Sequence, residues 1–190
     1  MNWYQKANLR FAQFLESKNN SKVLAHIAGP SGSGKTTILN DLSKKYPSVD
    51  FKDLDDFDDK AVEILGWKNV PKKQFTDKMI KSLAAKRQEL MNAYIAGSGK
   101  QIVFGGHHTE GDTVLEIPTN NKWMLDVDAR TSALRAYQRS QNEDQKFRRL
   151  KSELPSDTQE AQEIIDFLKT NGYKPMSAIA IDAWMAKNIK

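Results

Sequence analysis

The sequence has no cysteine among its 190 residues. This absence excludes a disulfide framework, a thiolate metal site and a cysteine nucleophile. Long apolar runs are missing as well. No stretch is long and apolar enough to cross a bilayer, and no run of signal-peptide length lies between Lys6, Arg10 and Glu16. We therefore expect a soluble, cytoplasmic protein without a membrane partner.

Positively charged residues are only slightly in excess of negatively charged ones. Lysine and arginine number 29 against 24 aspartates and glutamates, which gives a net charge of +5. A basic excess of this size suits the phosphates of a nucleotide and the backbone of a nucleic acid alike, so it does not distinguish these ligands. The length predicts a single domain over residues 1–190 and leaves the oligomeric state open.

A glycine-rich segment near the start of the chain carries the most specific pattern. Residues 29–36 read Gly-Pro-Ser-Gly-Ser-Gly-Lys-Thr, which matches G-x-x-x-x-G-K-[ST], between a strand-like and a helix-like segment. Glycines let successive backbone N–H groups turn toward an anion, and the N-terminus of the following helix attracts negative charge. The pattern predicts a loop that binds a nucleoside triphosphate, with Lys35 on the outer phosphates and the Thr36 hydroxyl on Mg²⁺. The expected nucleotide-binding residues are Gly29, Ser31, Gly32, Ser33, Gly34, Lys35, Thr36 and Thr37.

Apolar segments of strand length alternate with segments of helical periodicity. Strands are expected at residues 23–28, 49–54, 101–104, 123–127 and 178–181. Helices are expected within 1–20, from the phosphate loop to Pro47, from about Phe75 to Gly97, from near Arg130 past Arg139, from a capping box at Ser156 to Asn171-Gly172, and at the C-terminus. Residues 57–71 are expected to form a connection.

Because several of these strands are almost continuously apolar, the pattern predicts an α/β fold with a parallel sheet that is covered on both faces. Ligands of such sheets bind at the carboxyl ends of the strands. Four segments should therefore converge there: the phosphate loop, Asp53 to Asp56, Gly105 to His108, and Asp126-Val127-Asp128.

Acidic residues follow the second expected strand. Asp53 and Asp55 stand at alternate positions, so that both carboxylates point the same way if the strand continues. Phosphoryl transfer requires a metal to neutralise phosphate charge and a group to orient or deprotonate the acceptor. Asp53 would then support Mg²⁺, and Asp55, with Asp56 if the chain turns, would contact the acceptor. The alternative is a solvated acidic loop, because Asp58 and Asp59 continue the run.

The order of these motifs resembles the shikimate kinase and gluconate kinase group of small P-loop kinases, within the nucleoside monophosphate kinase-like fold. The resemblance spans most of residues 22–185. It is carried by residues 29–36, by Phe51-Lys52-Asp53-Leu54-Asp55, by Gly105-Gly106, by Met124 to Val127 with the arginine-bearing helix after them, and by residues 178–182. It implies a three-layer P-loop NTPase fold, with a mostly parallel five-stranded sheet, helices on both faces and an arginine-bearing lid at about 138–155.

The resemblance also implies roles for single residues. Asp53 would assist Mg²⁺ binding, and Asp55 would be the base or orienting group for the acceptor. Gly105 and Gly106 would let the backbone approach the acceptor. Arg139 would contact the transferring phosphate, and Arg135 would line the nucleotide side. The alternative for each arginine is a solvated surface cation.

Two features depart from the family. Residues 56–100 contain no Gly-Glu-x-x-Phe-Arg-like segment, which argues against shikimate as the acceptor. His107 replaces a third glycine after Gly106. His107 and His108 would bind the acceptor, form a metal site with Glu110 and Asp112, or be polar loop residues, and the loose ligand spacing disfavours the metal.

Other P-loop classes fit less well. Residues 121–124 end in Met124 and so lack the guanine-reading Asn-Lys-x-Asp of G proteins, and no transporter signature is present. A remodelling ATPase would have only Asp126-Val127-Asp128 as its acidic pair. Two functions remain. The first is an ATP- and Mg²⁺-dependent kinase that moves the γ-phosphate to a hydroxyl or phosphate of a small metabolite or nucleotide. The second is a polynucleotide 5′-kinase or another nucleic-acid-directed ATP-binding protein, which Arg148-Arg149 and Lys151 favour.

Overall fold

The structure, a computed structural model, describes residues 22–71, 74–106, 116–142 and 149–189, with the backbone of 109–110 and 113–114. The predicted N-terminal helix, His107, His108 and Arg148 lie outside the described residues. Within the described part, no helix has the length and apolar character needed to span a membrane.

The centre of the fold is a five-stranded sheet in the order β2-β3-β1-β6-β7, in which every neighbouring pair of strands is parallel. This confirms the predicted sheet. The strands are β1 (Val23–Ala28), β2 (Val49–Asp53), β3 (Gln101–Gly105), β6 (Lys122–Leu125) and β7 (Lys174–Met176). A separate antiparallel pair, β4 (Thr109–Glu110) and β5 (Thr113–Val114), follows β3.

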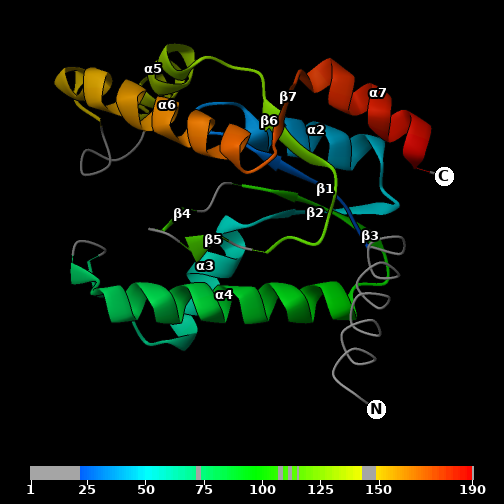
Figure 1. Ribbon diagram of the computed structural model, residues 1–190, viewed down its shortest axis with the longest axis horizontal. Helices are drawn as coiled ribbons and strands as arrows, with labels where there is room; N and C mark the ends of the chain where they lie inside the picture. The colour runs from blue at the N-terminus through cyan, green and yellow to red at the C-terminus, as the bar shows by residue number, and fades with distance from the viewer. Residues whose placement is uncertain are drawn as a thin grey trace, which may run out of the picture.

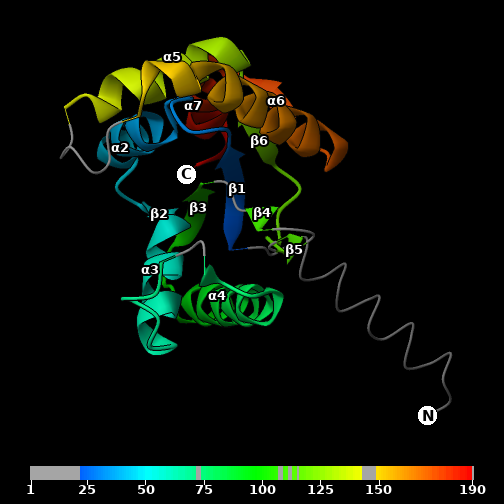
Figure 2. The ribbon, with the colours of Figure 1, turned by 90° about the vertical axis from the view of Figure 1, so that its left-hand side faces the viewer.

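Helices cover both faces of the sheet, as predicted. Because side chains alternate along a strand, Val103 of β3 packs on α2 (Lys35–Lys45) and α7 (Ala178–Asn188), whereas Phe104 packs on α3 (Asp55–Ile64) and α4 (Asp77–Gly97). On the face of Phe104, Met124 of β6 packs on α5 (Ala129–Ser140) and α6 (Leu154–Thr170). In Figures 1 and 2, α3 and α4 lie at one end of the molecule, nearer β2 and β3, and α5 and α6 lie at the other end, nearer β6 and β7.

The prediction of a strand at residues 178–181 was wrong, because these residues form the first turn of α7. The last strand is β7, just before them. The Ser177 side chain accepts a hydrogen bond from the Ala180 backbone N–H at 3.2 Å and so caps the helix. Ile181 and Met185, one turn apart, are fully buried. An apolar run of four residues does not by itself distinguish a strand from a buried helical turn.

The prediction of a plain connection over residues 57–71 was also wrong, because α3 occupies most of its first half. The acidic run stands in the first turn of this helix, where carboxylates interact favourably with the helix dipole. Phe57 and Ala61 are buried one turn apart. An ion pair of 2.8 Å between Asp58 and the buried Arg87 ties α3 to α4.

Helix α6 begins at Leu154, two residues before the predicted capping box at Ser156. The Ser156 hydroxyl instead donates to the Glu153 carbonyl at 2.7 Å, inside the helical turn. The Glu153 carboxylate accepts from the Leu150 backbone N–H at 2.7 Å, across a short 3₁₀ turn at Lys151–Glu153. The predicted end of the helix is confirmed, since Asn171 is its C-cap and Gly172 follows with φ 80°.

We expect Ser177→Ala to lower the free energy of unfolding by about 1 kcal/mol, because it removes the side-chain cap of α7. Ser177→Asp should retain most of the stability. Urea titration followed by circular dichroism measures both. Ser43→Ala is the matched control, since the exposed Ser43 hydroxyl only donates to the Asn40 carbonyl within α2. Equal urea midpoints for Ser177→Ala and Ser43→Ala would show that the cap makes no measurable contribution to stability.

Candidate functional site

The glycine-rich loop connects β1 to α2 and packs against the backbone of α5. Gly32 has φ 82°, and a methyl group on it would lie 2.1 Å from the Ser132 carbonyl oxygen and 2.8 Å from the Ala136 nitrogen. Only glycine tolerates both the backbone conformation and this approach. The loop is therefore held directly beside the helix that carries the predicted lid arginines.

The N-terminus of α2 lies at the end of this loop. Gly34, the N-cap, is in the left-handed conformation and supplies no side-chain hydrogen bond to the helix. The first backbone N–H groups of a helix need acceptors from elsewhere, and an anion can supply them. Among the described residues, the buried Ser33 hydroxyl also has no hydrogen-bond partner. Phosphate oxygens would satisfy both groups, so the loop fits a phosphate ligand.

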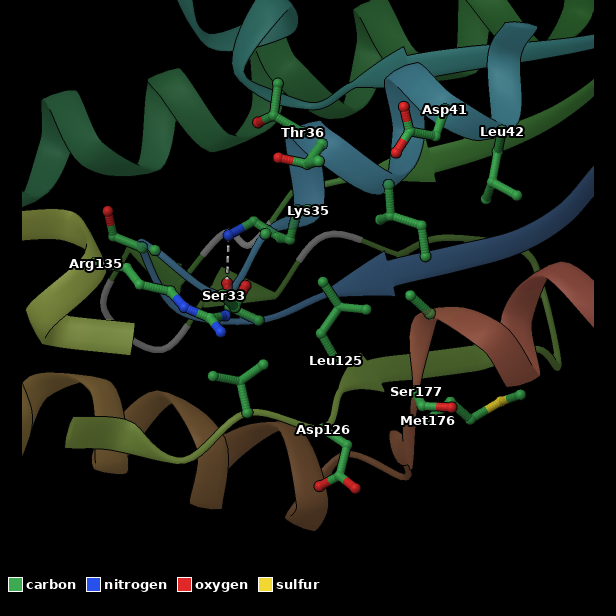
Figure 3. Close-up of a pocket in the computed structure, with 18 of the residues that line it drawn as sticks. Ser33, Lys35, Thr36, Asp41, Leu42, Leu125, Asp126, Arg135, Met176 and Ser177 are labelled. Carbon is green, nitrogen blue, oxygen red and sulfur yellow. Dashed lines mark hydrogen bonds between the residues drawn. The ribbon is translucent and has the colours of Figure 1, made fainter. Parts of the chain in front are cut away.

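Lys35 folds back over the loop. Its ammonium group donates to the carbonyl oxygens of Gly29 at 2.7 Å and Pro30 at 2.9 Å. Figure 3 labels Lys35 and draws a dashed hydrogen bond from its ammonium group. Burial lowers the pKa of Lys35 from its ordinary 10.5 to about 8, although the nearby carboxylates of Asp55 and Asp53 act in the opposite direction. The charge of Arg139 lowers this pKa further. The pKa of Lys35 thus depends on three neighbouring charges, those of Asp55, Asp53 and Arg139.

The acidic residues after β2 separate into two groups. Asp53 is the last residue of β2 and Asp55 the first of α3, and both line the same pocket as the loop. The Asp53 carboxylate accepts the Asp55 backbone N–H at 3.1 Å, which sets the turn between strand and helix. Asp56 instead forms an ion pair of 2.5 Å with Lys52 and is outside the pocket lining.

Two of the three arginines of α5 face the loop from the opposite wall. Arg135 and Arg139 stand one turn apart, and both line the pocket. Arg139 donates to the Ser31 hydroxyl at 3.3 Å. The structure therefore brings the lysine, the two carboxylates and the two arginines that the sequence singled out to a single pocket.

The start of α5 explains the other acidic segment. Asp128 caps the helix, with its two oxygens accepting the Thr131 N–H at 2.9 Å and the Thr131 hydroxyl at 2.6 Å. These hydrogen bonds lower the pKa of Asp128. Asp126 lines the pocket, whereas both carboxylate oxygens of Asp128 accept hydrogen bonds from Thr131 in the helix cap. Residues 126–128 therefore do not present the acidic pair of a remodelling ATPase.

Gly105 ends β3 and Gly106 follows it; both lie outside the pocket lining and have packing roles. A methyl group on Gly105 would lie 2.0 Å from Leu39 of α2. A methyl group on Gly106, which has φ 127°, would lie 2.9 Å from Cβ of Leu54 and 3.3 Å from Oδ1 of Asp53. The glycines therefore let α2 and the end of β2 approach β3. Their contact with an acceptor stays a prediction, as does that of His107.

The pocket has a volume of about 1030 Å³ and extends beyond the loop along α2 to α7. Its further wall comes from α2, α6 and the β7–α7 junction: Asp41, Leu42, Ile164, Met176, Ser177, Ala178 and Ile179. Ile179 is 83% exposed at this wall. Sequence reasoning missed the residues of the β7–α7 junction because it assigned 178–181 to a strand. The position of this junction at the end of the last parallel strand was the available signal, since such positions lie at the ligand-binding edge.

The part of the chain that the structure describes contains no group of three or more His, Cys, Asp or Glu side chains that could by itself hold a metal ion. Thr36 and Asp53, the predicted Mg²⁺ residues, both line the pocket. Because Mg²⁺ in nucleotide sites keeps several waters and binds the phosphates, one or two protein groups suffice. The residues present fit a magnesium ion that arrives with a nucleotide.

Comparison with solved structures shows the class of fold. Shikimate kinase from Acinetobacter baumannii, solved in complex with shikimate, matches 90% of this chain and 99% of its own with a TM-score of 0.50. The chain therefore has the three-layer P-loop NTPase fold of the shikimate kinase group, as its motifs predicted. The sequence identity is 16%, so this likeness shows the fold alone.

Sequence comparisons add a local likeness. Inorganic pyrophosphatase TTM2 from Arabidopsis thaliana is 32% identical over 77 residues, which are 40% of this chain and 11% of that protein. The chain thus spans about a tenth of the length of this curated relative. No family model matches the sequence.

The pKa of Lys35 predicts a pH dependence of nucleotide binding. An anion favours the charged lysine, so binding raises a pKa that is about 8 in the free protein. Above pH 8 the free protein must take up a proton, and affinity should fall by up to about tenfold per pH unit. Calorimetry with ATP in buffers of different ionisation enthalpy would detect the proton uptake.

Two variants test this assignment. Lys35→Met should bind ATP weakly and show no proton uptake. Lys44→Met is the control, because Lys44 is exposed and lies outside the pocket lining. Equal proton uptake in wild type and Lys35→Met would contradict the assignment.

Proposed function

We propose that the protein is a magnesium-dependent phosphotransferase that moves the γ-phosphate of ATP to a hydroxyl or phosphate group of a small metabolite or nucleotide. One observation carries the proposal: a single pocket joins a phosphate-binding loop to Lys35, to the carboxylates of Asp53 and Asp55, and to Arg139. Phosphoryl transfer requires this combination of cations around the phosphates and a carboxylate that orients or deprotonates the acceptor.

The nucleotide would bind along the loop and α2. The N–H groups of residues 31–37 would bind the phosphates, and Lys35 would exchange the carbonyls of Gly29 and Pro30 for phosphate oxygens. The nucleoside would extend toward Arg135 and the wall at Ile179, where an apolar side chain is exposed beside the pocket. Thr36 and Asp53 would hold Mg²⁺, which neutralises phosphate charge when bound.

The chemistry of this chain's own residues follows from their positions. Asp55 would orient the acceptor and accept its proton as the new P–O bond forms and the bond to the β-phosphate breaks. Lys35 and Arg139 would stabilise the negative charge that develops on the transferring group. Residues 138–155, the predicted lid, of which 143–148 lie outside the described residues, would close over the pocket and exclude water.

The acceptor is the least determined part of the proposal. Asp56, Gly105, Gly106 and His107 remain its predicted contacts, although Asp56 would first have to leave Lys52. The structural neighbour binds shikimate and the local relative is named for pyrophosphate hydrolysis, so both compounds belong among the substrates tested. An ATP-dependent enzyme of this kind would act in the cytoplasm.

The proposal is tested by an ATP-consumption screen. Candidate acceptors are sugar acids, shikimate, nucleosides, nucleoside monophosphates and 5′-hydroxyl oligonucleotides, with pyrophosphate hydrolysis measured alongside. Stimulation by a small molecule supports the proposal and names its acceptor class. Stimulation by oligonucleotides alone would indicate a polynucleotide 5′-kinase, and basal turnover with every compound would contradict a kinase.

Lys35→Ala should reduce phosphoryl transfer by about a hundredfold or more, because it removes a charge that stabilises the transition state. Turnover is measured as ATP-dependent product formation with the acceptor found in the screen. Lys44→Ala, at an exposed position outside the pocket lining, is the control and should retain wild-type turnover. Transfer at the wild-type rate by Lys35→Ala would refute the site.

Asp55→Asn should lower kcat by about a hundredfold while leaving ATP affinity within a factor of about two, because a general base acts in the chemical step. The matched control is Asp59→Asn, which changes an exposed carboxylate of the same helix outside the pocket lining. Normal turnover by Asp55→Asn would show that another group orients the acceptor.

A further inference from the structure

A buried histidine interrupts the apolar strand β1. His26 is 3% exposed, and both of its ring nitrogens have partners. Nδ1 lies 2.5 Å from the Tyr173 hydroxyl, and Nε2 lies 3.0 Å from the Gly106 carbonyl oxygen. The rings of His26 and Tyr173 meet edge to face at 5.3 Å. The two partners belong to opposite sides of β1, one beside β7 and the other at the end of β3.

The direction of these hydrogen bonds follows from the chemistry of the partners. A carbonyl oxygen only accepts, so Nε2 of His26 carries the proton and donates to Gly106. In a neutral imidazole the other nitrogen is then an acceptor, so the Tyr173 hydroxyl donates to Nδ1. Burial raises the pKa of Tyr173, which keeps this hydroxyl protonated. A continuous chain of two hydrogen bonds therefore runs from the Tyr173 hydroxyl through the His26 ring to the Gly106 carbonyl oxygen.

The Tyr173 end of the chain is anchored. Tyr173 is buried in the cluster that α6 forms with β6, two residues after Asn171, the C-cap of this helix. The Lys122 ammonium group lies 5.6 Å from the centre of its ring, which adds a cation–π contact. The hydroxyl that donates to His26 thus comes from a rigidly packed side chain.

The Gly106 end of the chain lies against the acidic strand end. A methyl group on Gly106 would lie 3.3 Å from Oδ1 of Asp53, so the Gly106 backbone is packed beside this carboxylate. The Leu54 backbone N–H donates to the Gly105 carbonyl at 2.7 Å, and the Gly106 N–H donates to Ile27 at 3.2 Å. The position of Gly106 therefore influences where the Asp53 side chain can lie.

We propose that His26 is a positioning residue, which fixes the Gly106 carbonyl and through it holds the Asp53 carboxylate in place for magnesium-dependent nucleotide binding. This inference rests on the proposed function, because Asp53 is assigned there to Mg²⁺. An aliphatic residue would fill this core position without the need for two buried hydrogen bonds. Groups that orient the ligands of a metal without touching it commonly change metal affinity when they are replaced.

The test is calorimetric titration of the full chain with ATP, with and without Mg²⁺. His26→Phe keeps a ring of similar size but loses both hydrogen bonds. We expect it to reduce the Mg²⁺-induced gain in ATP affinity by about tenfold. Its affinity for ATP without Mg²⁺ should match that of wild type, because the loop of residues 29–34 is unchanged. Tyr173→Phe, which loses only the donor to Nδ1, should cause a smaller reduction.

Tyr94→Phe is the matched control for lost stability. It removes a phenol hydrogen bond to Asp50, near the start of β2 and away from the acidic strand end. If His26 had a purely structural role, Mg²⁺ would increase the ATP affinity of His26→Phe as much as that of Tyr94→Phe and wild type. That result would overturn the inference while leaving the proposed function intact. If wild-type ATP affinity did not respond to Mg²⁺, the assignment of Asp53 and this inference would fail together.

A second measurement covers the case in which His26→Phe does not fold. His26→Gln retains an N–H donor for the Gly106 carbonyl, so we expect it to preserve most of the Mg²⁺ effect. Nitrogen-15 spectra of wild type should show a neutral His26 ring with the proton on Nε2, and the proton should remain there in Tyr173→Phe. A proton on Nδ1 would break the donor chain and refute the inference.

Discussion

The contact between Gly32 and the backbone of α5 is the constraint on which the site depends. A single methyl group there would lie 2.1 Å from the Ser132 carbonyl, so the loop and the helix approach as closely as backbone atoms allow. Because α5 begins at its Asp128 cap and lies against the loop at Ser132, the side chains of Arg135 and Arg139 reach the same pocket. The glycine of the loop therefore serves packing between elements as well as ligand access.

Charge balance organises the rest of the pocket. Burial lowers the pKa of Lys35, the charges of Asp55 and Asp53 raise it, and the charge of Arg139 lowers it. Hydrogen bonds to the loop carbonyls hold the ammonium group in place. A site with cations on both sides and carboxylates at one edge suits an anion that loses a phosphoryl group. The helix N-terminus of α2 and the buried Ser33 hydroxyl add neutral donors at the same place.

Polar hydrogen bonds across the middle of the sheet link its two halves. The cluster around α3 and α4 and the cluster around α5 and α6 lie on the same face, and His26 stands on the strand between them. A buried polar chain of this kind specifies geometry, because each of its groups needs its own partner. It joins the acidic strand end to the cluster of buried residues that includes Tyr173 and Ala129 of the arginine-bearing helix α5.

The sequence by itself determined the elements that depend on neighbours along the chain. The phosphate loop, the strand before it, the parallel sheet and the acidic pair after β2 follow from glycine spacing, apolar runs and positions at strand ends. The tertiary structure decided what depends on distant partners. Residues 178–181 became helical because Ser177 caps them and Ile181 finds the core, and Asp56 left the pocket because Lys52 lies nearby. Gly105 faces Leu39, and His26 finds Tyr173 and Gly106, partners that are 147 and 80 residues away in the chain. Local patterns cannot encode such contacts, because the distance between these residues is set only when the whole sheet is assembled.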